Sequence, residues 1–360
     1  MSDATTSTML RPFVEKAPEP MFLSGFFQTP PENFYMSEDV EIDIQRDGED
    51  VAIAIIDLAT GARHNENSKG SNKKFTPPIF KEKGSLNAFQ LLSREPGQHP
   101  FQSVAWVAKA LQRVGLMSGK LTGKVRRAIE LMCSQALQTG TVTCTDENGL
   151  AVYTIDFQPK NAHFVTTTPW AADGTGGNRR ADIDGLARTI RKNGHRSPDT
   201  LILGNTAQER LVADDEIKEL LKADGFYSGR AGLVPERPGV DGANFLGTIT
   251  INNYRYALWG YDGRYNDPQT GESLPYVDDD KIIMLSSKAR LDLTFGGIPR
   301  VAPPDGRALP FMPARASAPG LDMHPNAWLS EDGETLQVSV ASRPLPVATE
   351  IDSFGCLDVA

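Results

Sequence analysis

Apolar and polar residues follow two different periods in the first half of the chain, and the first of these predicts strands. Residues 40–45 alternate between aliphatic and polar side chains, which is the period of a half-buried strand. Residues 51–56 form a short apolar run after an Asp-Gly turn and are predicted to be its partner strand. Residues 61–74 then turn polar, and an extended path resumes at Phe75. Residues 40–91 are therefore predicted to form long strands around an exposed polar tip, and a protruding connection of that length indicates a binding role.

The strongest helical period covers residues 101–138, where apolar residues recur every three or four positions. The stripe is interrupted near Gly119, so the pattern predicts two helices, of which the second is longer. Gly140 follows as a helix terminator. Residues 142–145 and 150–157 are then predicted to form a hairpin.

A second unit is predicted to begin near Asp182, where short helices and strands start to mix in the manner of an α+β domain. Its predicted helices are residues 183–192, 207–212 and 216–223. Its predicted strands are residues 200–203, 248–251, 255–261 and 281–286. A proline-rich stretch follows from Pro299, and the chain closes with three short predicted strands at residues 337–341, 343–347 and 356–359.

The first 34 residues combine five prolines with a dense group of large apolar side chains. This group consists of Met21, Phe22, Leu23, Phe26 and Phe27. Leaving four such side chains in water would forgo on the order of 6 to 12 kcal/mol of burial free energy. The segment must therefore dock, and the sequence leaves open whether it docks on its own core or on a neighbouring subunit.

Composition and charge narrow the class of protein. The 360 residues are 39% hydrophobic and 23% charged, which is typical of a folded globular protein. The formal net charge of -9 disfavours specific binding to a nucleic acid backbone. The apolar run at residues 51–56 is far too short to span a membrane, and the polar residues 1–10 do not resemble a secretory signal, so a cytosolic chain is expected.

Local motifs of catalysis and metal binding do not occur in their usual forms. Cys133, Cys144 and Cys356 lack the spacing of a zinc site or a disulfide framework. The glycine-rich residues 174–177 lack the Lys-Ser/Thr pair of a phosphate-binding loop. No serine lies in a Gly-x-Ser-x-Gly turn. We therefore expect no catalytic residues, no cofactor and no metal.

Two groups of carboxylates support the main alternative, a cytosolic metal-dependent hydrolase. Asp182 and Asp184 precede a glycine as in a calcium loop, but further acidic ligands are missing, and a cap on the following helix explains them better. Residues 278–280 are three consecutive aspartates, which point to alternate sides of an extended chain and fit a solvated turn. A small-molecule binding α+β protein is a third possibility.

Three groups of residues, spread over most of the chain, match one known family. The opening group is Pro20, Phe22, Leu23, Phe26, Phe27, Phe34 and Tyr35. The middle group is Phe75, Thr76, Pro77, Ile79, Lys81, Arg94, Pro96 and Gly97. The closing and most specific group is Phe295, Gly296, Pro325, Trp328, Asp332, Val338, Ser339, Val340, Pro344, Leu345 and Pro346. Together they resemble the lambda-type major capsid proteins of tailed phages, the major capsid protein E family.

The resemblance implies an α+β fold of the Hong Kong 97 type, divided into five segments. These are an N-terminal arm (1–36), an extended β loop (37–95), a peripheral domain with a long spine helix and a β hairpin (96–181), an axial α+β domain (182–298) and a return to the peripheral domain (299–360). The proline-rich residues 299–319 depart from the family pattern.

The function implied is that of a major capsid protein, assembled in the host cytoplasm and resident in the virion. Identical chains would form hexamers and pentamers that close an icosahedral shell around double-stranded DNA, contacted without sequence specificity. No long charged helical segment precedes the arm, so a separate scaffolding protein and a portal are the expected partners, whereas binding of a decoration protein is left open. No membrane contact is expected. A protein nanocompartment shell is the alternative within the same class.

Six residues are the predicted subunit contacts: Phe22, Phe26 and Phe27 of the arm, and Lys73, Lys74 and Phe75 of the loop. Removal of residues 1–31 is expected to leave a folded subunit that cannot assemble. Trimming of residues 61–74 is expected to weaken contacts between capsomers and to spare individual rings.

Overall fold

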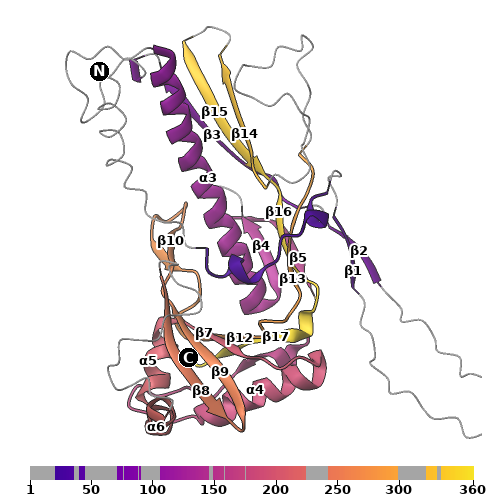
Figure 1. The fold of residues 1–360 in the computed structure, drawn as a ribbon, viewed down its shortest axis with the longest axis vertical. Helices are drawn as coiled ribbons and strands as arrows, with labels where there is room; N and C mark the ends of the chain where they lie inside the picture. Colours follow the sequence, from indigo (N-terminus) through magenta and orange to yellow (C-terminus); the bar gives the residue numbers. More distant parts are fainter. Residues whose placement is uncertain are drawn as a thin grey trace, which may run out of the picture.

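The computed structural model describes residues 21–35, 40–44, 71–75, 77–87, 89–90, 106–145, 149–157, 159–174, 176–223, 242–298, 322–330 and 334–360. These residues form an elongated molecule in which two regions lie end to end (Figure 1). We name them the long-helix region, built around helix α3, and the six-stranded region, built around the largest sheet.

Helix α3 (Trp106–Thr139) runs for 34 residues, or about 50 Å, without a break. The sequence prediction of two helices is therefore wrong. The gap in the apolar stripe near Gly119 does not end the helix. A Cβ added at Gly115 or Gly119 would meet no atom within 4 Å, so neither glycine marks a close approach of another element. Each glycine weakens the helix by about 1 kcal/mol, which packing on the strands offsets.

The strands of the long-helix region form three small antiparallel sheets. The first, in the order β14-β15-β3, consists of β14 (His324–Leu329), β15 (Thr335–Ser342) and β3 (Phe80–Asn87). The second pairs β13 (Leu291–Phe295) with β16 (Pro344–Ala348), and the third pairs β4 (Thr141–Thr145) with β5 (Ala151–Asp156). The predicted hairpin and the late strands at residues 337–341 and 343–347 are confirmed, with shifted ends.

The six-stranded region contains a mixed sheet in the order β6-β17-β12-β7-β9-β8. Its strands are β6 (Phe164–Thr166), β7 (Thr200–Leu203), β8 (Ala243–Ile251), β9 (Tyr254–Tyr261), β12 (Lys281–Leu285) and β17 (Phe354–Asp358). Helices α4 (Arg179–Gly194), α5 (Asn205–Ala213) and α6 (Asp215–Ala223) accompany it, and the hairpin of β10 (Arg264–Asn266) and β11 (Ser273–Pro275) extends from it (Figure 1). The predicted helices and strands of this unit are confirmed, with shifted ends.

The chain passes between the two regions several times. Strand β17, at the C-terminal end, pairs with β12 and β6 in the six-stranded sheet. Strand β13 instead leaves for the long-helix region, where it pairs with β16. The predicted boundaries at residues 182 and 298 therefore do not account for β13 and β17, which pair in the region on the other side of a boundary. The five predicted segments stay a prediction.

Two hydrophobic cores support this arrangement. One core lies along α3 and the strands of its region and continues to Trp259 and Tyr261 of β9. The other core lies between the six-stranded sheet and the buried faces of α4, α5 and α6. Because the first core includes residues of β9, the two regions share apolar packing. No helix in the described part of the chain combines the length and the hydropathy that crossing a bilayer requires.

Candidate assembly site

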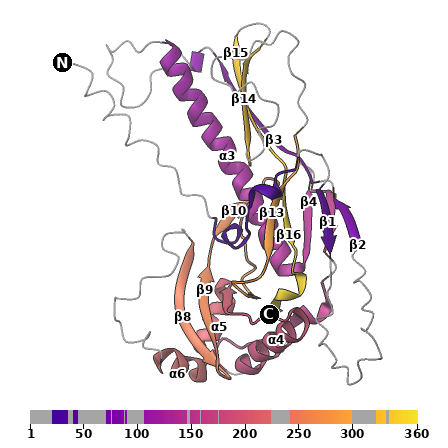
Figure 2. The same ribbon diagram turned by 45° about the vertical axis from the view of Figure 1, so that its right-hand side comes forward.

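Residues 21–35, the described part of the predicted arm, run beside strand β13 (Figure 2). The backbone N–H of Gln28 donates to the carbonyl of Leu291 at 2.7 Å, and the N–H of Leu293 donates to the carbonyl of Gln28 at 2.8 Å. Two short 3-10 helices, η1 (Ser24–Phe26) and η2 (Pro31–Asn33), bend the segment around these contacts. The segment is thus tied by its backbone to its own chain.

The aromatic side chains of this segment also find partners within the chain. Phe22 is 2% exposed, and its ring centroid lies 5.3 Å from that of Trp259 and 5.2 Å from that of Tyr261. Phe27 is 5% exposed. Residues of the same chain thus bury Phe22 and Phe27, and the predicted contact of these two side chains with a neighbouring subunit stays a prediction. Phe26 is half-buried, and its predicted role at a subunit contact stays a prediction.

This burial reverses the expectation for a truncated chain. Removal of residues 1–31 would take Phe22, Leu23 and Phe27 out of the largest core, so a folded truncated subunit is no longer expected. Apolar residues in an arm do not by themselves identify a contact between subunits.

Glu130 connects this segment to both regions. Its carboxylate accepts hydrogen bonds from the backbone N–H of Leu23 at 2.7 Å, from the N–H of Ser24 at 2.9 Å and from the hydroxyl of Tyr261 at 3.0 Å. The residue lies on α3 and is fully buried. Burial raises the pKa of Glu130 above its ordinary value, although the three hydrogen bonds oppose that shift. The same burial, with the neighbouring carboxylate, raises the pKa of Tyr261.

The hydrophobic pattern of the sequence did not single out Glu130. Its position held a signal, since an acidic residue stands between Ile129 and Leu131 in the most apolar turn of the predicted helix. A carboxylate placed there is expected to have buried donors, which a hydrophobic pattern alone does not supply.

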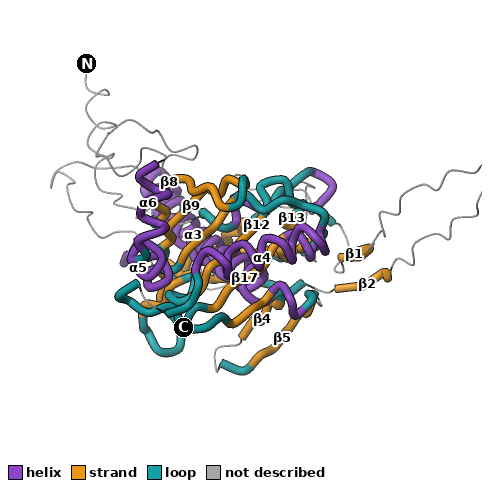
Figure 3. The backbone as a smooth tube through the Cα atoms, turned by 90° about the horizontal axis from the view of Figure 1, so that it is seen from below, coloured by secondary structure: helices purple, strands orange, loops and turns teal. Residues whose placement is uncertain are grey.

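The described part of the predicted loop is a two-stranded ribbon. Strand β1 (Val40–Ile44) pairs antiparallel with β2 (Ser71–Phe75), and the ribbon lies beside the body of the molecule in Figure 3. Neither strand joins another sheet in the part of the chain that the structure describes. The ribbon is thus a separate two-stranded sheet, as are the pairs β4–β5, β10–β11 and β13–β16 among the described residues.

All three predicted contact residues of the loop lie in β2. Lys73 is paired with Ile42 and Lys74 with Glu41, so these lysines are strand residues, not part of the polar tip that the sequence predicted. The predicted partner of β1, residues 51–56, lies outside the described residues. A subunit contact through Lys73, Lys74 and Phe75 stays a prediction.

Arg343, which the sequence pattern also did not single out, binds the backbone just after the ribbon. Its side chain is buried, and its guanidinium donates to the carbonyl of Pro77, two residues after β2, at 3.0 Å. It also donates to the carbonyl of Gly297 at 3.0 Å. The planar guanidinium thus joins the end of the ribbon to the segment that follows β13.

The two carboxylates of the first candidate metal site bind different protein side chains. The carboxylate of Asp182 accepts from the indole N–H of Trp170 at 2.9 Å. Asp184 is buried and pairs with Arg188 at 2.7 Å. The expected helix cap is also wrong: Asn178 caps α4, and its side chain accepts a first-turn backbone N–H.

In the second candidate group, two of the three aspartates have basic partners. Asp278 pairs with Lys281 at 2.5 Å, and Asp280 pairs with Arg210 at 3.0 Å. Within the described ranges, no three His, Cys, Asp or Glu side chains are grouped closely enough to hold a metal ion. The hydrolase alternative therefore has no assembled site to support it among these residues.

An α+β chain with one long helix across several small sheets, a six-stranded unit at one end and a ribbon beside the body matches the fold of solved structures of the Hong Kong 97 type. A solved structure of a protein assigned as a prophage capsid protein, from E. coli CFT073, matches with a TM-score of 0.60. It is 17% identical, and the match covers 81% of this chain and 80% of that one.

Two further solved structures match with lower TM-scores. One is from Gordonia phage Cozz, with a TM-score of 0.49, 10% identity and coverage of 96% of this chain and 88% of that one. The other is the SrpI encapsulin complex from Synechococcus elongatus PCC 7942, with a TM-score of 0.45, 12% identity and coverage of 95% and 88%. No curated protein matches the chain significantly.

The family model of phage major capsid protein E matches residues 6–355, and the chain belongs to this family. It is therefore a major capsid protein of a tailed phage, a structural component of the icosahedral shell of the virion, and not an enzyme. Membership confirms the resemblance that the three groups of sequence motifs indicated.

Proposed function

We propose that the shell is built from hexamers and pentamers of this chain, and that the β1–β2 ribbon makes the contact that links one subunit to the next. Capsid proteins of this family assemble into shell oligomers. The observation that carries the proposal is the ribbon itself, which pairs with no other sheet among the described residues. Strands at the edge of a sheet offer unpaired backbone groups to a second chain, and repeated heterologous contacts of one kind build rings.

The two regions correspond in this proposal to the two domains expected of the fold. The long-helix region supplies the peripheral domain, and the six-stranded region supplies the axial domain near the centre of each ring. Residues 1–36 and 37–95 supply the arm and the extended loop. The match in overall fold to the prophage capsid structure supports this division.

The charge of the chain bears on its contact with DNA, whereas the other proposed partners rest on what the family resemblance implies. With a net charge of -9, the chain favours weak contact with packaged DNA that lacks sequence specificity. A separate scaffolding protein and a portal complete the proposed assembly pathway.

The test replaces residues 40–75, and with them the β1–β2 ribbon, with a short Gly-Ser linker, because the register pairs Val40 with Phe75 and so brings the two ends together. Electron microscopy and size-exclusion chromatography of the purified variant then report assembly, beside a Lys124→Ala control on the exposed face of α3. We expect the control to form closed shells and the shortened variant to stop at single rings or monomers. Closed shells from the shortened variant would contradict the role of the ribbon and leave family membership untouched.

A further inference from the structure

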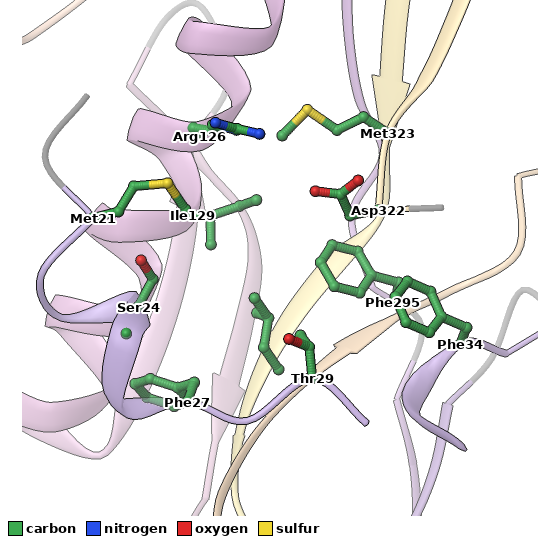
Figure 4. Close-up of a pocket in the computed structure, with 12 residues that line it drawn as sticks. Met21, Ser24, Phe27, Thr29, Phe34, Arg126, Ile129, Phe295, Asp322 and Met323 are labelled. Atoms are coloured by element: carbon green, nitrogen blue, oxygen red, sulfur yellow. The ribbon is translucent and has the colours of Figure 1, made fainter. Parts of the chain in front are cut away.

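A cavity of about 490 Å³ lies between residues 21–35, helix α3, strand β13 and the start of β14 (Figure 4). Most of its lining is apolar. The apolar side chains that matter most are Met21, Phe27, Phe34, Ile129, Phe295 and Met323. The volume falls within the range of about 300 to 1,000 Å³ that binding pockets occupy in proteins. The cavity has the size and the chemistry to receive a few apolar side chains.

The wall also carries one charge of each sign. Arg126 extends from α3 toward Met323, and the carboxylate of Asp322 lies beside Met323, across the cavity from α3 (Figure 4). Asp322 is exposed, and Arg126 is half-buried. A ligand with large apolar side chains and a basic group would thus meet apolar surface and the single carboxylate of Asp322, with the guanidinium of Arg126 on the α3 side of the cavity.

The chain carries a segment with this chemistry directly before the cavity. Residues 9–14 read Met-Leu-Arg-Pro-Phe-Val and are the apolar run of the first twenty residues. Six residues separate Val14 from Met21, which itself lines the cavity. Seven residue steps of extended chain span up to about 24 Å, so the segment can fold back onto the cavity. Pro12 restricts Arg11 to extended conformations, which lowers the entropy lost on docking.

We propose that residues 9–14 of the same chain occupy this cavity, with Leu10 and Phe13 against its apolar wall and Arg11 facing Asp322. The segment fills the cavity in the unassembled subunit and fastens the N-terminal residues to the long-helix region. A partner that uses the same cavity must displace it first. The proposal concerns the single chain, so it does not depend on the contacts that build the shell.

The test measures amide hydrogen exchange of Phe13 and Val14 in the unassembled full-length chain, with a synthetic peptide of residues 1–20 as the reference. We expect exchange about tenfold slower or more in the chain, and independent of protein concentration. Phe13→Ser abolishes the protection, whereas the matched control Thr5→Ser leaves it unchanged. The melting temperature of each variant shows that the fold persists.

A charge exchange tests the position of Arg11. Asp322→Arg alone reduces protection of residues 9–14, and the double variant with Arg11→Glu restores it. Exchange at the rate of the peptide would overturn the proposal. Protection that rises with concentration, or that occurs only in shells, would place the segment on a second copy and would overturn it as well. Protection that survives Phe13→Ser would do the same.

Discussion

Residues 21–35 pack against α3, β9 and β13 of their own chain, whereas the β1–β2 ribbon pairs with no further sheet in the described residues. The first segment is strongly apolar, and the sequence left open whether it docks on its own core or on a neighbouring subunit, although predicted subunit contacts lie in both elements. The contrast teaches that apolar content shows that a segment needs burial and does not show where. The aromatic surface of β9 supplies that burial within the subunit.

The largest expected effect belongs to Phe22. We expect Phe22→Ala to lower the free energy of unfolding of the unassembled chain by about 3 to 5 kcal/mol, because a ring buried between α3 and β9 leaves a cavity. Chemical denaturation of the monomer measures this loss, and Phe26→Ala, at a half-buried ring, serves as the smaller-effect control. An unchanged monomer with failed assembly would return Phe22 to the subunit contacts.

The second-largest effect is expected from Glu130→Ala. The substitution leaves the N–H groups of Leu23 and Ser24 and the hydroxyl of Tyr261 without their acceptor, at about 1 to 3 kcal/mol for a buried group left unpaired. We expect residues 21–35 to loosen first, seen as faster limited proteolysis in that segment. Equal proteolysis in the variant and the natural chain would show that Glu130 does not hold it.

The pH dependence of the stability that Glu130 contributes tests its burial. Because its pKa is higher in the folded chain than its ordinary value of 4.5, the folded state binds the proton more tightly than the unfolded state. Its contribution to stability is therefore most favourable at low pH and declines as the pH rises from about 4.5 through the folded pKa. Relative to Glu130→Gln, which does not titrate, the natural chain should lose stability over this window. A difference that grows in the opposite direction would contradict burial as the main cause.

A proline substitution in β2 tests the role of the ribbon in assembly. Lys73→Pro removes a backbone donor from β2, so we expect assembly to fail, while the melting temperature of the monomer changes little. Lys73→Ala keeps the backbone donor and is the matched control. A large loss of monomer stability would mean that the ribbon belongs to the subunit core, in the manner of residues 21–35.

The smallest effect is expected at the surface of α3. Lys124 and Glu82 form a salt bridge of 3.1 Å with side chains 58% and 41% exposed. Lys124→Ala should change the free energy of unfolding by about 0.5 kcal/mol or less, because exposed pairs are screened by water and salt. A loss beyond 1 kcal/mol in denaturation experiments would assign this pair a structural role.

Local signals explain which elements the sequence could predict. The β4–β5 hairpin and the helices of the six-stranded region follow from periodicity and turn residues within short windows. The pairing of β15 with β3 does not, since Leu336 lies opposite Leu86 across most of the chain. Pairing between such distant strands depends on packing that no single window contains.

The candidate assembly site likewise has features that the sequence could predict and features that it could not. The need to bury Phe22 and Phe27 was predictable from their size, but their partners Trp259 and Tyr261 lie more than 200 residues away. Glu130 and Arg343 read as surface charges by residue type, and only the fold brings backbone groups to them.

Hydrogen exchange at the backbone amides of Leu23 and Ser24 tests the central claim, that residues 21–35 belong to the core of each subunit before assembly. Both amides donate to the buried carboxylate of Glu130. We predict that they exchange slowly in the unassembled chain and no more slowly in closed shells. Exchange as fast as in a peptide before assembly, slowed only in the shell, would contradict the claim and make this segment a contact between subunits.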